Sequence, residues 1–289
     1  MSRKDKKTAV VDDLIKIHNI VGKSDGDVEA ALKRLAKNYD VLNRYRHRVR
    51  TSEHKTHLKL GDMDIVYLVK EAPSNGELVF SLRSISENVP HRDVWFIGGK
   101  PKGTHPDHHV KIVQTSPIKW QNTSQLLRTA CLNDEISDEF MLFNDDFFVL
   151  RPITELPYYS DGDLNRRIEE LEERNKAGSK YISQLRNTYM MLYGKCLPTQ
   201  NYALHVPMVI NKYEMLETFD TFPKGLMWRS IYGNHHQKPT EYMQDVKIYD
   251  CSEDIPDGAV FVSTNDDTFD AGIVGAKIRK RFPDKCRYE

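Results

Sequence analysis

The 289-residue chain has few cysteines and no long apolar run, and each shortage excludes a class of protein. Its four cysteines are widely spaced and form no C-x-x-C pair, so neither a disulfide framework nor a zinc site is expected. No apolar segment approaches the roughly 20 residues that span a bilayer. The first residues, Met1–Lys7, also lack the apolar stretch of a signal peptide. We therefore expect a globular protein of the cytoplasm without a membrane segment.

The chain also lacks net charge, because 42 Lys and Arg residues balance 42 Asp and Glu residues. Taken alone, this balance argues against a nucleic-acid partner. The charges are unevenly distributed, however, since residues 1–60 contain 15 basic and 8 acidic residues, a net charge of +7. Residues 61–289 therefore carry a net charge of −7. The basic excess at the start of the chain keeps nucleic acid among the candidate partners.

Residues 1–60 have the apolar spacing of a small, all-helical module. Helices are predicted over residues 25–35 and 39–50, joined by a short turn at 36–38. The second helix carries a group of arginines that we expect to contact DNA: Arg44, Arg46, Arg48 and Arg50. Two short helices ending in such a group suit a helix-turn-helix unit. A helical cap with a solvated basic face fits the same pattern, and both interpretations stay open.

Near Gly61 the pattern changes to alternating strands and helices. Apolar runs predict strands over residues 65–69, 94–97, 110–113 and 140–143, with amphipathic helices around 78–85 and 122–131. This alternation predicts an α/β fold over residues 61–289, with a mostly parallel, Rossmann-like sheet flanked by helices. Ligands of such sheets bind at the carboxyl ends of the strands.

A charged helical stretch at about 161–197 interrupts the alternation and is interpreted as an insertion. Its second half mixes basic and aromatic side chains, namely Arg186, Tyr189, Met190 and Tyr193. A plain surface helical hairpin is the alternative to a functional role.

The strongest chemical signal is Asn144-Asp145-Asp146, which follows the strand predicted over residues 140–143 and precedes the apolar run Phe147–Leu150. Adjacent carboxylates at a strand end are suitable ligands for Mn²⁺ or Mg²⁺, which often bridge protein carboxylates and a substrate diphosphate. An Asx-rich turn between two strands is the alternative. The large aromatic residues on both sides favour the metal site.

Several segments carry a family likeness: Asp64–Tyr67 with Leu78–Asn88, Phe140–Asp146, His205–Lys212 and Trp228–Gly233. They resemble the blocks of the Stealth family of sugar-phosphate transferases, over residues 62 to about 250. The resemblance implies a GT-A-like glycosyltransferase fold and a nucleotide-diphosphate sugar, above all a UDP-sugar, as donor. The chain departs from the family at Leu68–Ala72, which replaces a Thr-Trp-Val-(Asp/Asn)-Gly sequence. This departure weakens the inference of phosphate transfer but leaves the scaffold and the metal block.

The resemblance also implies roles for single residues. The expected metal ligands are Asp145, Asp146 and His205, and the expected donor-binding residues are Asp64, Arg83 and Lys212. Asp64 would contact the nucleoside, and the two cations would contact the phosphates. The expected catalytic residues are Asp146, Arg229 and Asp245. Asp245, with Glu241 as the alternative, would be the base that removes the acceptor proton in an inverting transfer, whereas a retaining transfer needs no such base. A structural or surface role is the alternative for each isolated charged residue.

Three functions are compatible with these features. The first is a glycosyltransferase resembling in logic the bacteriophage enzymes that modify hydroxymethylated pyrimidines, with double-stranded DNA as acceptor and the target base extruded. The second is a glycosyl or sugar-phosphate transferase that acts on a capsular or wall polysaccharide. The third is a non-enzymatic DNA-binding protein with an inactive transferase domain. The intact acidic motif counts against the third.

Overall fold

The computed structural model describes residues 59–173, 179–223 and 227–289. Residues 1–58 of the predicted N-terminal module, including Arg44, Arg46, Arg48 and Arg50, lie outside these ranges. Within them, no helix combines the length and apolar character needed to cross a membrane.

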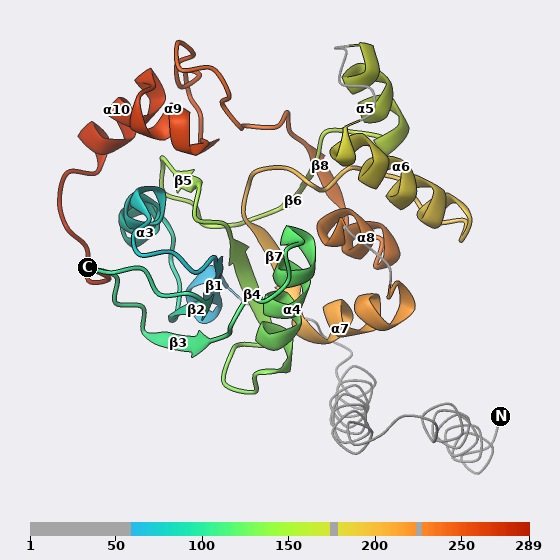
Figure 1. Cartoon of the computed structure of the whole chain (residues 1–289), viewed down its shortest axis with the longest axis horizontal. Coiled ribbons are helices and arrows are strands. Elements are labelled where there is room, and N and C mark those ends of the chain that lie inside the picture. The colour runs from blue at the N-terminus through green and yellow to red at the C-terminus, as the bar shows by residue number, and fades with distance from the viewer. Residues whose placement is uncertain (1–58, 174–178, 224–226) are drawn as a thin grey trace. The chain divides into compact units, whose positions relative to one another are not determined.

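A central five-stranded sheet organises the described residues (Figure 1). Its strands, in the spatial order β3-β2-β1-β4-β7, are His108–Lys111, Val94–Gly98, Asp64–Val69, Glu139–Phe143 and Met208–Asn211. The first four are mutually parallel, whereas β7 runs antiparallel to β4. This arrangement confirms the predicted α/β class with a mostly parallel sheet. The strand predicted to begin at Val110 begins two residues earlier.

Helices cover both faces of the sheet (Figure 1). The helices that pack on it are α3 (Gly76–Asn88), α4 (Lys119–Leu132) and α7 (Lys212–Thr221). Side chains alternate between the faces of a strand, so β1 directs Ile65, Tyr67 and Val69 toward the apolar side of α3. On the other face, α4 packs against β1 and β2 and contacts α7. Because both faces of β1 are buried, its sequence after Asp64 is apolar, from Ile65 to Val69.

The chain leaves the sheet after β4, turns at residues 144–146, and continues as β5 (Phe147–Val149). One edge of β5 pairs with β9 (Phe261–Ser263) in a second, two-stranded sheet. At the other edge of β5, polar side chains of α3 form hydrogen bonds with the backbone N–H and C=O groups of the strand. Ser81 Oγ donates to Phe147 O at 2.6 Å, Val149 N donates to Ser84 Oγ at 3.1 Å, and Asn88 donates to Val149 O at 2.9 Å. These bonds fix α3 and the turn before β5 relative to each other.

The remaining elements surround this core. Within the range predicted as a helical insertion lie α5 (Leu164–Leu171) and α6 (Lys180–Tyr193), which pack on each other, and α6 also contacts α8 (Trp228–His235). A third sheet pairs β6 (Tyr158–Ser160) with β8 (Thr240–Tyr242), and the helices α9 (Asp266–Asp270) and α10 (Ile273–Arg281) follow β9. A single 3₁₀ turn, η1 (Leu60–Asp62), precedes β1.

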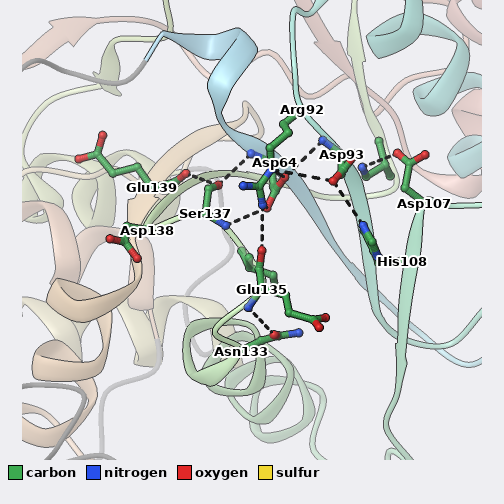
Figure 2. A network of polar contacts seen from close by, with 12 residues as sticks. Asp64, Arg92, Asp93, Asp107, His108, Asn133, Glu135, Ser137, Asp138 and Glu139 are labelled. Atoms are coloured by element: carbon green, nitrogen blue, oxygen red, sulfur yellow. Dashed lines mark hydrogen bonds and ion pairs between the residues drawn. The ribbon is translucent and has the colours of Figure 1, made fainter. Parts of the chain in front are cut away.

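A polar network joins the amino ends of β1, β2 and β4 (Figure 2). The Asp64 side chain is fully buried and accepts two bonds from Arg92, at 2.8 and 2.6 Å, and one from the Ser137 backbone at 2.8 Å. Arg92 also donates to Glu135 O at 2.8 Å. The buried carboxylate thus links loops that precede three neighbouring strands.

We expect Arg92→Met to destabilise the fold by about 2 to 4 kcal/mol, because it leaves the buried Asp64 carboxylate with backbone donors alone. Denaturant unfolding measures this loss. The matched control is Arg128→Met, which removes a surface ion pair with Asp220 and is expected to cost less than about 1 kcal/mol. Equal losses in the two variants would contradict the structural role of Asp64.

Candidate functional site

The predicted acidic motif lies at the carboxyl edge of the sheet. Asn144, Asp145 and Asp146 directly follow β4, whose carboxyl end is level with those of β1 and β2. β7 is antiparallel and therefore begins at this same edge, where Met208 pairs with Leu142. The direction of β7 thus brings His205, three residues before Met208, to the edge that carries the two aspartates.

Asp145 lies against the first turn of α3. The side chain of Asn75 caps this helix by accepting from Leu78 N at 2.9 Å and donates through Nδ2 to Asp145 Oδ2 at 2.6 Å. Glu77, also in the first turn, is 8% exposed and accepts a bond from Thr264 Oγ1 at 2.6 Å. Burial and the neighbouring Asp146 raise the pKa of Asp145. Burial, with the added charge of both aspartates, raises the pKa of Glu77 to about 7.

Only one of the two carboxylate oxygens of Asp146 has hydrogen-bond partners among the described residues. Its Oδ2 forms an ion pair with Lys247 Nζ at 2.6 Å and accepts a bond from Ser263 Oγ at 3.1 Å. Its Oδ1 is enclosed, yet within the described residues it has no hydrogen-bond partner. A carboxylate oxygen in this state is prepared to receive a cation or a donor.

Arg229, from the first turn of α8, carries the opposite charge beside Asp146. Its guanidinium lies 5.3 Å from the ring centroid of Phe147 and donates through Nη1 to the backbone oxygens of Leu204 and Val206. Its enclosed Nη2 has no partner in the described part of the chain. Burial lowers the pKa of Arg229 to about 10, although the negative charges of Asp146 and Asp245 act to raise it. The guanidinium therefore stays positive at neutral pH.

His205 and Asp245 form a pair that also contacts Phe147. The imidazole meets the Phe147 ring edge to face with centroids 6.4 Å apart. Its Nδ1 lies 3.0 and 2.9 Å from the two carboxylate oxygens of Asp245, and Asp245 Oδ1 also accepts from the His205 backbone at 2.9 Å. Burial alone would raise the pKa of Asp245, but the bonds from His205 hold it below its usual value. The ionised carboxylate keeps the proton on Nδ1 and leaves Nε2 as the basic nitrogen.

A pocket of about 390 Å³ opens at the carboxyl ends of β1, β2 and β3. Its lining includes the polar residues Glu71, Lys100, His109 and Lys111. The turn after β2 allows this shape because Gly98 has a φ of +112°, and a Cβ atom there would lie 2.3 Å from Val69 O. The pocket follows the rule that open α/β sheets bind ligands at their carboxyl edge.

Three residues expected at the donor site lie elsewhere, and the structure corrects these expectations. Asp64 is buried at the opposite, amino edge of the sheet, where Arg92 and backbone groups occupy its carboxylate (Figure 2). Lys212 follows the carboxyl end of β7, which lies at that same edge, and donates to Ile136 O at 2.8 Å. Arg83 is held by both carboxylate oxygens of Glu289 at 2.7 Å. Each of the three has a structural partner instead of a free site.

The expected set of metal ligands is only partly brought together. Asp145 and Asp146 are adjacent, but His205 is bonded to Asp245. Over the ranges that the structure describes, no group of three or more His, Cys, Asp or Glu side chains is arranged to hold a metal ion. A cation at Asp146 Oδ1 would therefore need further ligands from its substrate.

Sequence reasoning missed Asn75, Glu77, Lys247 and the pocket at the ends of β1 to β3. Two signals were present in the sequence: Asn75 is an N-cap residue type ahead of an apolar helix, and Gly98-Gly99-Lys100 is a turn that directly follows a strand. Lys247 carries no local signal, since only the tertiary fold places it beside Asp146.

Comparison with known proteins adds no further assignment, because no family model matches the chain and no curated protein matches its sequence.

We expect Glu77→Gln to stabilise the protein above pH 7. The pKa of Glu77 is about 7 in the fold and ordinarily 4.5, so the folded state holds its proton longer than the unfolded state. This contribution to stability is full below about pH 4.5 and is lost as the pH rises to about 7. Gln mimics the protonated form and keeps the acceptor for Thr264. Denaturant unfolding should show a gain of about 1 to 3 kcal/mol at pH 8 and little change at pH 4.5.

The control is Glu87→Gln, at an exposed position of the same helix, which should change stability by less than about 0.5 kcal/mol at both pH values. An equal effect of Glu77→Gln at both pH values would contradict a protonated Glu77.

Proposed function

We propose that the protein is a metal-dependent glycosyltransferase that moves a sugar from a nucleotide-diphosphate sugar to an acceptor hydroxyl. The observation that carries this proposal is a pair of enclosed, oppositely charged atoms without partners in the described residues, Asp146 Oδ1 and Arg229 Nη2. A ligand that satisfies both offers a cation or a hydrogen-bond donor to the carboxylate and an anion or another acceptor to the guanidinium. A divalent cation bound to a diphosphate offers both.

Asp145 and Asp146 would hold Mn²⁺ or Mg²⁺, and the unpaired oxygen of Asp146 fits such an ion. The chemistry that the bound ion supplies is neutralisation of the charge on the departing diphosphate. Arg229 acts on the same charge from within the protein. Its guanidinium is held by Phe147 and two backbone oxygens, so it needs no reorganisation when the diphosphate leaves.

The pocket at the ends of β1 to β3 supports a nucleoside at the same edge of the sheet. Its lysines, Lys100 and Lys111, suit a ligand that bears phosphate, and His109 and Glu71 offer hydrogen bonds to a base or ribose. A UDP-sugar placed with its nucleoside there directs its diphosphate toward the carboxyl end of β4. This placement is that of a GT-A-like, Rossmann-related enzyme.

His205 is the best-placed base for the transfer. Its Nε2 would take the proton of the acceptor hydroxyl while the oxygen attacks the anomeric carbon, and the bond to the nucleoside diphosphate breaks. Asp245, expected from the sequence to be the base itself, instead directs both oxygens at Nδ1 and positions the imidazole. Direct displacement with such a base inverts the configuration at the anomeric carbon.

The acceptor that we propose is a hydroxymethylated pyrimidine of double-stranded DNA, modified in the cytoplasm. Its support is the net charge of +7 over residues 1–60. Mass spectrometry of hydroxymethylated DNA incubated with Mn²⁺ and a panel of nucleotide sugars tests donor and acceptor together. A hexose or pentose mass on the base is the expected product, and modification of a capsular polysaccharide alone would reject DNA as the acceptor.

We expect Asp146→Asn and Arg229→Gln each to lower the turnover of the nucleotide sugar at least about 100-fold, because each removes a group that stabilises the leaving diphosphate. EDTA should have the effect of Asp146→Asn. The controls are Asp134→Asn and Arg128→Gln, which make the same changes on the surface and should retain activity. Full turnover in EDTA would show that the acidic pair serves the fold alone.

We expect His205→Gln to lower kcat of the transfer about 100- to 10,000-fold while leaving the affinity for UDP and Mn²⁺ within about twofold, because a general base acts on the acceptor alone. Asp245→Asn should lower kcat less, since it disturbs the tautomer without removing the base. Steady-state kinetics and calorimetric titration with UDP separate the two effects. A parallel loss of UDP affinity in His205→Gln would place His205 at the donor instead.

A further inference from the structure

α6 presents a stripe of aromatic and basic side chains on one side. Arg186, Tyr189, Met190 and Tyr193 follow the spacing i, i+3, i+4 and i+7, so they share one side of the helix. Met190 and Tyr193 are 63% and 64% exposed, and the Tyr189 and Tyr193 rings are stacked with centroids 5.7 Å apart. The apolar side of the helix is already buried, through Ile182, Leu185, Thr188 and Leu192. The packing of α6 on the rest of the domain therefore does not depend on the stripe.

α6 itself carries positive charge. Lys180–Tyr193 contains two basic residues and no Asp or Glu, whereas residues 61–289 as a whole carry a net charge of −7. The acidic side chains of the helix packed against it lie within and directly after α5, at Glu169, Glu170, Glu172 and Glu173. Lys180, Arg186 and Lys195 lie on or directly after α6. Arg186 forms an ion pair with Glu172 from the end of α5, so Lys180 and Lys195 supply most of the local positive charge.

The first turn of α6 reaches the proposed active site. Tyr181 is 40% exposed, and its hydroxyl lies within electrostatic range of Asp245 and of Tyr249, which is 63% exposed. From Tyr181 to Tyr193 the helix extends about 18 Å, at 1.5 Å per residue. In Figure 1, α6 runs outward from the region of α8, the helix that carries Arg229. α6 thus begins within electrostatic range of Asp245, and its exposed stripe lies further along the helix.

We propose that the exposed face of α6 binds the DNA strand that carries the acceptor base. Bases stack on Tyr189 and Tyr193, and phosphates lie near Lys180, Arg186 and Lys195, while Tyr181 borders the base that enters the site. This assignment rests on the proposed function and adds the place where its acceptor is held. Stacking rings combined with positive charge are the recognition chemistry of an unpaired nucleic-acid strand, so a duplex acceptor has to open around the extruded base to bind here. A neutral polysaccharide would use the rings but would gain nothing from the lysines at the two ends of the helix.

Photocrosslinking of the full-length protein tests this surface directly. The probe is a hydroxymethylcytosine-containing oligonucleotide with 5-iodouracil next to the modified base, in single-stranded and duplex form. Trypsin cleaves after Arg186 and Lys195, so a crosslink to the stripe appears on the peptide Asn187–Lys195, which contains both stacked tyrosines. We expect this crosslinked peptide. Crosslinks confined to residues 1–60 or to other peptides would overturn the proposal.

Binding measurements with variants give an independent readout. Fluorescence anisotropy with the same oligonucleotide should show about tenfold weaker binding for Tyr193→Ala and no loss for Tyr193→Phe, which keeps the stacking ring. Lys195→Gln should reduce the slope of log affinity against log salt by about 1. The charge control is Lys280→Gln, at an exposed position on α10, which lies far from α6 in Figure 1 and should leave the slope unchanged.

The outcomes separate this proposal from the function on which it rests. If Tyr193→Ala weakens DNA binding but still hydrolyses the nucleotide sugar at the normal rate, both proposals are supported. If the wild-type protein turns over the nucleotide sugar and Tyr193→Ala binds DNA normally, the proposal that α6 binds DNA is wrong, and the proposed transferase function is retained. If the wild-type protein has no turnover but crosslinks through Asn187–Lys195, the transferase fails and the DNA surface stands.

Discussion

The turn between β4 and β5 is the constraint on which the site depends. Both strands are buried, and they belong to different sheets, so the chain must change direction within Asn144-Asp145-Asp146. Polar groups fix this turn from both sides. Asn75 at the start of α3 binds Asp145, and Lys247 binds Asp146. With the backbone of β5 also bonded to α3, the two carboxylates cannot spread apart to lower their repulsion. Burial raises the pKa of Asp145, and this enforced proximity to Asp146 raises it further. Lys247 and Arg229 offset part of the negative charge at this turn, and a bound cation would relieve the remainder.

Residues near the acidic motif were predictable from the sequence, because a mostly parallel sheet places the residues after its strands at one edge. That rule requires the strand directions, and the apolar run of β7 does not reveal its direction. A strand buried on both faces has the same composition whether it runs parallel or antiparallel. The direction decides which end of the block His205–Lys212 reaches the site. Since β7 is antiparallel, His205 lies at the carboxyl edge and Lys212 at the amino edge, although the two are only seven residues apart in the sequence.

Isolated charged residues were the least predictable part, because their partners are distant in the sequence. Arg83 is bonded to Glu289, 206 residues away, and Asp64 to Arg92, 28 residues away. A buried charge must be neutralised, and the fold supplies the nearest group that does so. Arg229 differs from these residues in one respect that only the structure reveals: one of its enclosed nitrogens stays without a partner among the described residues. In the sequence, charge alone made Asp64, Arg83 and Arg229 equal candidates for the site. In the structure, Asp64 and Arg83 are paired with other side chains, whereas Arg229 keeps a nitrogen without a partner among the described residues.

The distribution of charge also bears on how an anionic acceptor would approach such a site. Asp145, Asp146 and Asp245 lie at the proposed reaction centre, and the part of their charge that Lys247 and Arg229 do not offset repels a phosphate backbone at short range. Attraction must then come from outside this cluster, at a distance where the repulsion is screened by salt, which is about 8 to 10 Å at physiological ionic strength. An acid-free helix that extends about 18 Å from the site provides cations at that distance and aromatic rings along the way. A single base could then enter the acidic centre as a neutral ring while its phosphates remain on the basic surface. A negative catalytic domain and a nucleic-acid acceptor are therefore compatible when the two charges are separated along the path of the strand.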